Sequence, residues 1–366
     1  MMSLFFFAFE AKNTDQRRKF LSRSWKLYKK NYIADQGFVL DRSEDRVTSE
    51  GQAYALVRAV WMRDQETFDR VLEWTENHLL IESGLYAWLW NPSKKFLVEQ
   101  NTAADADQEI AFALILASHA FRQKKYLNRA QNLLVAIRTH ERLEVPSGWF
   151  PAAGNWAVEE RIVNLSYFYP YAYPYFNQID PEGDWLGVLQ TGYELLFRTL
   201  GRSQVNLIPD FMMVDSEGTP KFLPECSDLS GQFSYDAMRI YWRMAIDCQL
   251  HQRSIACKNH VHPLSIGFIA DIFVRDRSIY ARYSYSGEPL EKSESLSFYG
   301  SVLPWFKIHF PQLAQSILNK HLSQQTLKEI INKKNRYYDL NWVWFGLAAI
   351  DGLIKERTPK PEEILD

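Results

Sequence analysis

Two aspartates stand one residue apart at the start of an apolar segment, NTAADADQEIAFALILA, which covers residues 101–117. The apolar run predicts a buried helix that begins close to Asp105. Thr102 and Asp105 have the spacing of a capping box, and acids in a first turn interact favourably with the helix dipole. Helix capping therefore explains the position of Asp105 as readily as a role in catalysis or ligand binding does. In both cases the helix start favours the ionised carboxylate, which suits binding a polar ligand or stabilising positive charge.

Two further acids stand at predicted helix starts. Glu50 lies in TSEGQAYAL, where Ser49 can act as the N-cap and Gln52 as its capping-box partner. Asp236 lies in FSYDAMRIYWRMAID, with Arg239 three residues later as an ion-pair partner. Each acid alone is explained by helix capping. Together the three acids indicate a shared site, because the inner helices of a barrel can point their N-termini at one cleft.

Carboxyl groups that face each other across a glycosidic bond are the usual apparatus for hydrolysing it. Other chemistries lack their motifs, since the sequence has no GxGxxG, GxxxxGK[ST], GxSxG or HExxH segment. Cys226, Cys248 and Cys257 have no metal-like spacing, and their odd number argues against a complete disulfide framework. We therefore expect neither a metal ion nor a cofactor.

Aromatic residues are unusually abundant, with 12 Trp, 19 Tyr and 23 Phe, or 15% of the chain. A large core can absorb them, but many stand beside Gly, Pro and Asn in segments that read as loops, where exposed rings suit the apolar faces of sugars. The net charge of -2 gives no electrostatic reason to expect nucleic acid or an anionic membrane as a partner. No run of eighteen apolar residues predicts membrane insertion.

Helical periodicity dominates the chain, and strand signals are sparse. The predicted helices cover residues 49–63, 66–80, 105–122, 126–141, 183–199, 234–250, 262–274, 311–319, 324–332 and 339–355. They come in pairs joined by short turns, which fits either an α/α toroid or a solenoid. Because no fixed sequence period is visible, we predict an all-α fold closed into a barrel.

Several segments resemble glycoside hydrolase family 8. ADADQEIAFALILASHAF is similar to the family signature, although Ala104 stands where relatives usually carry Ser or Thr. TSEGQAYALVRAVWMRDQETFDRVLEWT is similar to the segment that carries the proton donor. GLYAWLW, NLSYFYP, IPDF and SYDAMRIYW match in the same order, although NLSY departs from the usual Asn-Pro-Ser-Tyr. The resemblance spans about residues 20–350 and is nearest to endoglucanases encoded with bacterial cellulose synthesis.

This resemblance implies an (α/α)6 barrel and an inverting, endo-acting hydrolysis of β-1,4-glucan. Glu50 matches the general acid, Asp236 the general base of the cellulase-type subgroup, and Asp105 the aspartate that contacts the sugar at the cleavage site. We expect the pKa of Glu50 to be raised by burial or by Asp105, against the effect of its helix start. Tyr167 could hold the attacking water, and Arg239 could keep Asp236 ionised.

Stacking platforms are expected among the rings of the aromatic loops. Trp88 is the first candidate, and Trp90, Trp149 and Tyr235 follow, with core packing as the alternative for each. Asp107 is expected to be a structural partner of Asp105.

Other substrates and a loss of activity stay open. The same fold could act on xylan, mixed-linkage glucan or chitosan, and chitosan would call for extra acids along the cleft. A non-catalytic glucan-binding subunit is the other alternative, although a binder would not need the three acids. A link to the cellulose synthase secretion complex follows from the resemblance alone.

We expect a single catalytic domain over residues 19–357, an N-terminal segment at 1–18 and a tail at 358–366. The start, MMSLFFFAFEAK, reads either as a remnant of a signal peptide or as an ordinary N-terminus, since it lacks a basic region. A protein that works on cellulose during extrusion should be periplasmic or secreted.

Overall fold

The computed structural model describes residues 2–224, 229, 231–252, 255–257 and 267–365, with side chains from residue 15 onward. Five long helices in this part of the chain are buried over nearly their whole surface, because their sequences are apolar on all sides. They are α2 (Ser49–Trp61), α4 (Ala104–Phe121), α8 (Arg239–Leu250), α11 (Leu296–His309) and α14 (Tyr337–Ile350).

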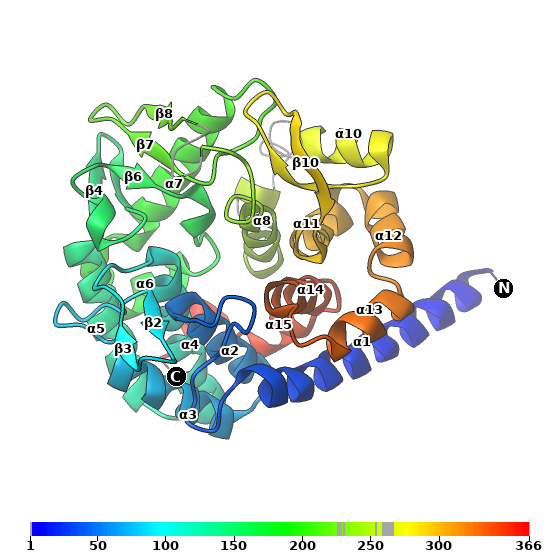
Figure 1. Cartoon of the computed structure of the whole chain (residues 1–366), viewed down its shortest axis with the longest axis horizontal. Helices are drawn as coiled ribbons and strands as arrows, with labels where there is room; N and C mark the ends of the chain where they lie inside the picture. The colour runs from blue at the N-terminus through cyan, green and yellow to red at the C-terminus, as the bar shows by residue number, and fades with distance from the viewer. Residues whose placement is uncertain (1, 225–228, 230, 253–254, 258–266, 366) are drawn as a thin grey trace.

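These buried helices form a ring (Figure 1). Helix α2 packs on α4, α8 packs on α11, and α11 packs on α14. Between α4 and α8 the ring is completed by the short helix α6 (Tyr173–Ile179) and the 3-10 turn η2 (Leu165–Tyr167). The ring closes where Arg58 of α2 donates a hydrogen bond of 2.7 Å to the side-chain oxygen of Asn341 of α14.

A second set of helices covers the ring from outside and is amphipathic. In α13, for example, Leu327, Ile330 and Ile331 are buried, whereas Lys328 and Glu329 between them are exposed. The set comprises α3 (Gln65–His78), α5 (Lys125–His140), α7 (Trp185–Leu200), α10 (Gly267–Asp276), α12 (Pro311–Lys320) and α13 (Gln324–Asn332). Helix α1 (Met2–Tyr32) packs on α13 and α14, and its N-terminal end projects past the body of the protein (Figure 1). None of the described helices is both long enough and apolar enough to span a bilayer.

Short antiparallel strands fill the connections between helices. One sheet has the order β1-β2-β3, one has the order β6-β7-β8, and β4-β5 and β9-β10 form two hairpins. The strands are β1 (Val47–Thr48), β2 (Leu89–Asn91), β3 (Phe96–Leu97), β4 (Arg142–Val145), β5 (Gly148–Pro151), β6 (Ile162–Val163), β7 (Met212–Val214), β8 (Pro220–Phe222), β9 (Tyr280–Tyr283) and β10 (Pro289–Glu294). Strand β1 runs directly into α2 and fixes the start of that helix.

Most predicted helices have a counterpart in the structure, and the differences have local causes. Residues 339–355 form two helices, because Gly352 has a φ of 78° and ends the continuous stretch before α15 (Leu353–Arg357). The predicted helix 234–250 begins only at Arg239, and the first part of 262–274 lies outside the described residues. Helices α1, α6 and α11 were not predicted from periodicity; Pro304 lies inside α11, where proline is normally a breaker.

Two further features concern the ends of helices. Cys248 and Cys257 form a disulfide between the last turns of α8 and the 3-10 turn η4 (Ile255–Cys257). The odd number of cysteines argued only against a complete disulfide framework, and one pair is compatible with it; Cys226 lies outside the described residues. After α15 the chain returns to the barrel, where Thr358 accepts a hydrogen bond of 3.1 Å from the indole N–H of Trp61.

Candidate active site

Glu50 is the second residue of α2. The N-cap of this helix is Thr48, whose hydroxyl oxygen accepts a hydrogen bond of 3.1 Å from the N–H of Gly51. The prediction that Ser49 caps the helix is therefore wrong, and Gln52 is not its partner. Gln52 is fully buried and its side-chain oxygen instead accepts a backbone N–H from the preceding loop at 2.6 Å.

The glycine after Glu50 has a steric reason. A Cβ atom on Gly51 would lie 2.4 Å from the hydroxyl oxygen of Tyr337, which is closer than atoms can approach. Tyr337 is a wall residue of the same cleft as Glu50. The Ser-Glu-Gly sequence thus lets a tyrosine of the last inner helix approach the start of the first.

Asp105 is the second residue of α4, and no side chain caps this helix. The hydroxyl of Thr102 donates instead to the carboxylate of Glu141 at 2.6 Å, so the predicted capping box is wrong. One oxygen of Asp105 accepts the N–H of Ala106 at 2.9 Å, and the other faces the centre of the cleft. Ala104 beside it is fully buried, where a hydroxyl group would need a partner.

Asp236 lies in a tight turn before α8 and not in the helix itself. A second aspartate holds this turn. Asp210 is 2% exposed, and one of its oxygens accepts the N–H groups of Ser234 at 2.9 Å and Ala237 at 2.8 Å. Its other oxygen accepts the Ser234 hydroxyl. Because Asp210 fixes both ends of the turn, it fixes the position of Asp236.

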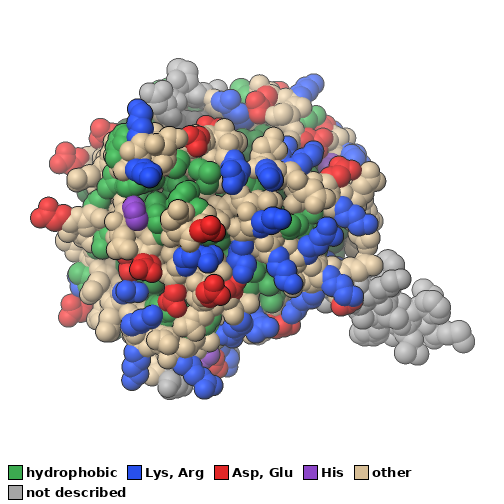
Figure 2. Space-filling model, turned by 60° about the horizontal axis from the view of Figure 1, so that its bottom comes forward, with side chains coloured by type: hydrophobic (Ala, Val, Ile, Leu, Met, Phe, Trp, Pro, Cys, Tyr) green, Lys and Arg blue, Asp and Glu red, His purple; other side chains and the backbone are tan. Residues whose placement is uncertain are grey.

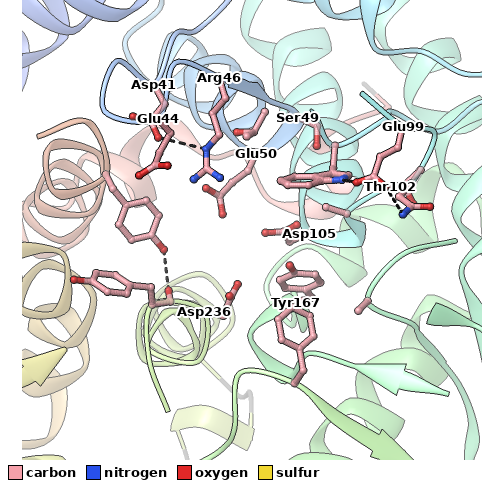
Figure 3. Close-up of a pocket in the computed structure, with 18 of the residues that line it drawn as sticks. Asp41, Glu44, Arg46, Ser49, Glu50, Glu99, Thr102, Asp105, Tyr167 and Asp236 are labelled. Atoms are coloured by element: carbon pink, nitrogen blue, oxygen red, sulfur yellow. Dashed lines mark hydrogen bonds and ion pairs between the residues drawn. The ribbon is translucent and has the colours of Figure 1, made fainter. Parts of the chain in front are cut away.

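One guanidinium joins the three acids. Arg239 is 1% exposed and donates to Glu50, to Asp105 at 2.9 Å and to Asp236. The side chains of Glu50, Asp105 and Asp236 are 25%, 3% and 32% exposed, so Asp105 lies at the bottom and the other two at the walls. Figure 3 shows the three acids and Tyr167 turned toward a common space. The three acids therefore converge as predicted, although Asp236 stands in the turn before α8 and not at a helix start.

A second ion pair supports this group one helical turn deeper. Arg243 of α8 lies 3.4 Å from Glu109 of α4, and its guanidinium is 3.6 Å from the centre of the Tyr169 ring. Both charged side chains of the pair are almost completely buried. Helices α4 and α8 are thus joined by two ion pairs, Asp105–Arg239 and Glu109–Arg243. The deeper pair fixes the position of Arg239 relative to Asp105.

Burial and charge together set the protonation of the acids. Burial is the main reason that the pKa of Glu50 rises to about 7, and the charges of Asp105 and Asp236 add to the rise while Arg239 opposes it. The raised pKa expected for Glu50 is confirmed, with burial as the dominant cause. The pKa of Asp236 is also raised by burial, with Arg239 acting in the opposite direction.

The acids lie on the wall of an open cleft of about 920 Å³. Trp88, half-buried, lines this cleft, and its indole N–H donates to Glu99 at 2.5 Å. Tyr167 is 7% exposed, and the guanidinium of Arg239 lies 5.2 Å from its ring centre. Tyr235 is 40% exposed at the rim. These three predicted residues are brought together with the acids.

Two predicted platforms do not line the cleft. Trp149 is 1% exposed, its N–H donates to the carbonyl of Gly183 at 2.9 Å, and its ring packs against Trp185. The expectation that Trp149 binds substrate is therefore wrong. Trp90 packs edge-on against Trp74 and His78 and does not line the cleft. In both cases packing in the core or between connections explains the ring.

Several cleft residues were not singled out from the sequence. Trp156, Phe211 and Tyr338 line the cleft, and Asp210 supports its floor. Trp156 stands in a Gly-Asn-Trp segment and Asp210 in Ile-Pro-Asp-Phe. Both segments predict a turn, but nothing in either indicates that these two side chains belong to the cleft.

Asp107 belongs to a buried pair of carboxyl groups beneath the cleft. Asp107 and Glu141 are fully buried and share a hydrogen bond. Burial raises the pKa of Glu141 to about 8 and raises that of Asp107 strongly, where the charge of Glu141 adds to the effect. A shared proton is therefore held at neutral pH. Through the Thr102 hydroxyl this pair supports the loop that leads to Asp105.

The profile of "Glycosyl hydrolases family 8" matches residues 1–266. The chain belongs to glycosyl hydrolase family 8.

Relatives within family 8 agree with this assignment. A protein named endoglucanase from Escherichia coli (strain K12) is 30% identical over 230 residues, which is 60% of this chain and 60% of the relative. The chain thus matches about 60% of the length of such curated relatives.

Solved structures of similar fold cover almost the whole chain. An endo-1,4-D-glucanase from Vibrio fischeri ES114 superimposes with a TM-score of 0.72 at 24% identity, covering 89% of this chain and 93% of that one. A β-1,3-1,4-glucanase from Paenibacillus sp. X4 gives a TM-score of 0.79 at 20% identity, covering 93% of both chains. The predicted (α/α)6 barrel of glycosyl hydrolase family 8 is confirmed.

Proposed function

We propose that this chain is an endo-1,4-β-glucanase that cleaves with inversion, with Glu50 as general acid and Asp236 as general base. The observation that carries the proposal is the set of three acids around Arg239, in which the most deeply buried acid lies at the bottom and two acids with raised pKa values stand at the walls of one open cleft. Inversion needs an acid on one side of the bond and a base that activates water on the other.

The role of Glu50 follows from its protonation. With a pKa of about 7, a substantial fraction of Glu50 carries a proton at neutral pH and can give it to the leaving oxygen. Substrate that fills the cleft would exclude water further and strengthen this effect.

The role of Asp236 follows from its position against Arg239. The guanidinium stabilises the carboxylate, which can then take a proton from water, and Tyr167 is the hydroxyl we assign to holding that water. Asp105 is almost fully buried and bonded to Arg239, so we assign it to binding the sugar hydroxyls at the cleaved bond.

The substrate assignment rests on the shape and lining of the cleft. It is open, has a volume of about 920 Å³, and is lined in part by the aromatic side chains of Trp88, Trp156 and Tyr235. Glu99 holds the indole N–H of Trp88, which fixes the plane of that ring. The endoglucanase names of the relatives favour β-1,4-glucan, and the Paenibacillus neighbour keeps mixed-linkage glucan as an alternative.

Export to an oxidising compartment is part of the proposal. The disulfide between Cys248 and Cys257 is of the kind that persists outside the cytoplasm. We therefore propose a periplasmic or secreted enzyme. A contact with the cellulose synthase secretion complex stays a prediction from family resemblance.

The test measures reducing-sugar release from amorphous cellulose, xylan, lichenan and chitosan. Glu50→Gln and Asp236→Asn should each lower the rate on cellulose by about a hundredfold or more, with unfolding curves like those of the wild type. Glu159→Gln and Asp35→Asn, matched changes at exposed acids outside the cleft, should leave the rate unchanged. Product anomers followed by NMR report inversion directly. Retention on cellulose without hydrolysis of any of the four polymers would leave only a binding protein.

A further inference from the structure

Helix α1 presents a stripe of basic side chains to solvent. Exposed residues Lys19, Arg23, Lys26 and Lys30 follow one another at spacings of four, three and four, which places them on one face of the helix. The opposite face packs into the protein through the buried side chains of Leu21, Trp25, Tyr28 and Tyr32. The stripe is therefore a fixed feature of a packed helix.

A groove with an apolar floor runs beside this stripe. It has a volume of about 470 Å³ and lies between α1 and the helices α12 and α13. Its apolar residues are Phe20, Leu318, Leu322, Leu327, Ile331 and Leu347. Arg17, Lys19, Arg23 and Lys328 surround this floor, and no acidic residue is among the described residues that line the groove. Cations around an apolar floor suit a ligand that is itself both anionic and apolar.

The positive charge is local. The chain has a net charge of -2, yet Lys320, Lys328, Lys333 and Lys334 are also exposed on the neighbouring helices and turns. Figure 2 shows Lys and Arg side chains gathered along this face. We expected no electrostatic attraction to an anionic membrane because the net charge is small. Net charge does not reveal that basic side chains are concentrated on one face.

We propose that the face formed by α1 and α13 docks on the surface of an anionic phospholipid membrane. A row of cations attracts the headgroups, and the adjacent apolar groove can accept part of an acyl chain. Docking of this kind needs no membrane-spanning helix, and it is independent of the proposed catalytic function.

Vesicle sedimentation tests the proposal with the full chain. Vesicles of phosphatidylcholine alone are compared with vesicles that contain 30% phosphatidylglycerol, at roughly 50 mM and 500 mM NaCl. We expect binding to the anionic vesicles at low salt, with an apparent affinity that falls at least about tenfold at high salt and on neutral vesicles.

A charge-reversal variant identifies the face. Arg23→Glu, Lys26→Glu and Lys30→Glu together should lower the affinity by at least about tenfold. Lys94→Glu, Lys124→Glu and Arg202→Glu make the same change in charge at exposed positions outside this face and should bind like the wild type. Far-UV circular dichroism and glucanase rate confirm folding of both variants. Wild-type protein that stays in solution, or equal loss in both variants, would overturn the proposal.

Discussion

Opposing effects act on the pKa of Glu50. Its place in the first turn of α2 favours the charged form, whereas burial and two neighbouring acids favour the protonated form, and burial dominates. The family-based expectation of a raised pKa needed no coordinates. Which effect dominates did need them, because burial of a residue at a helix start depends on the segments that cover it.

Removing the charge of Asp105 should alter the pH dependence of the enzyme. The carboxylate of Asp105 raises the pKa of Glu50, so Asp105→Asn lowers that pKa and Glu50 loses its proton at lower pH. The alkaline limb of kcat/KM should therefore move to lower pH. The rate itself should fall by about tenfold or more, because the proposed role of Asp105 is a charged hydrogen bond to the sugar. An unmoved alkaline limb in residual activity would contradict the assignment of Glu50 as the acid.

The buried pair of Asp107 and Glu141 should make stability fall with rising pH. The pKa of Glu141 is about 8 when folded, so between its unfolded value near 4.5 and pH 8 the folded protein holds a proton that the unfolded chain has released. Glu141 alone should make the free energy of unfolding decrease by about 1.4 kcal/mol per pH unit over this range, and Glu50, whose pKa is also raised, adds a slope of the same sign up to about pH 7. Glu141→Gln should therefore lower the total slope by about 1.4 kcal/mol per pH unit.

Urea unfolding at pH 5, 6, 7 and 8 measures the slope. Glu160→Gln, at an exposed position, serves as the matched control and should keep the wild-type slope. Equal slopes in both variants would show that the two carboxyl groups do not share a proton.

At the scale of elements, the turn from Ser234 to Met238 decides how Asp236 is presented. Asp210 accepts three hydrogen bonds from this turn and is almost completely buried. Asp210→Ala leaves the buried N–H of Ala237 without its partner, at a cost of about 1–3 kcal/mol, and also removes the acceptor of the partly buried N–H of Ser234. We expect kcat to fall by roughly tenfold to a hundredfold with little change in KM, since substrate contacts are retained.

Asp210→Asn is the informative companion to that change. Its amide oxygen can still accept both backbone N–H groups, so activity should be largely restored while the alanine variant stays impaired. If the alanine variant lost stability but kept its kcat, Asp210 would support the fold without positioning Asp236.

The presence of a helix could be predicted from the sequence far better than the residue at which it begins. The periodicity of α2, α4 and α5 gave their ranges to within about two residues. The caps could not be predicted, because Thr102 has the spacing of a cap but finds Glu141, a partner 39 residues away. Likewise Trp88 and Trp149 both stand a few residues after a glycine. The packing of Trp149 against Trp185, which the sequence does not reveal, shows that Trp149 belongs to the core.

At the scale of the whole molecule, charge is divided between two regions. The cleft is lined by Asp41, Glu44 and Glu99 in addition to the three central acids, with Arg46 as the one basic side chain among its described lining residues. Net charge could not reveal this division. The expected division into residues 1–18, 19–357 and 358–366 stays a prediction.

An acidic cleft should discriminate against anionic polymers. At about 20 mM NaCl we expect kcat/KM on carboxymethyl cellulose to be several-fold below that on uncharged hydroxyethyl cellulose, because exposed acids repel the carboxymethyl groups. Raising the salt to about 200 mM should raise the rate on the anionic polymer several-fold and leave the neutral one nearly unchanged. Equal salt responses on both polymers would show that the acids along the cleft are too well screened or neutralised to matter.

The contacts of Arg239 also bear on how the chain reaches its working state. The three acids that it joins come from residues 50, 105 and 236, so these contacts span up to 189 positions of sequence. Contacts of such separation form late, after local helices and hairpins are in place. Until these contacts form, Arg239 and the three acids lack the opposite charges that compensate them. Recovery of hydrolysis during refolding would therefore mark the last step of assembly, and helical content would return first.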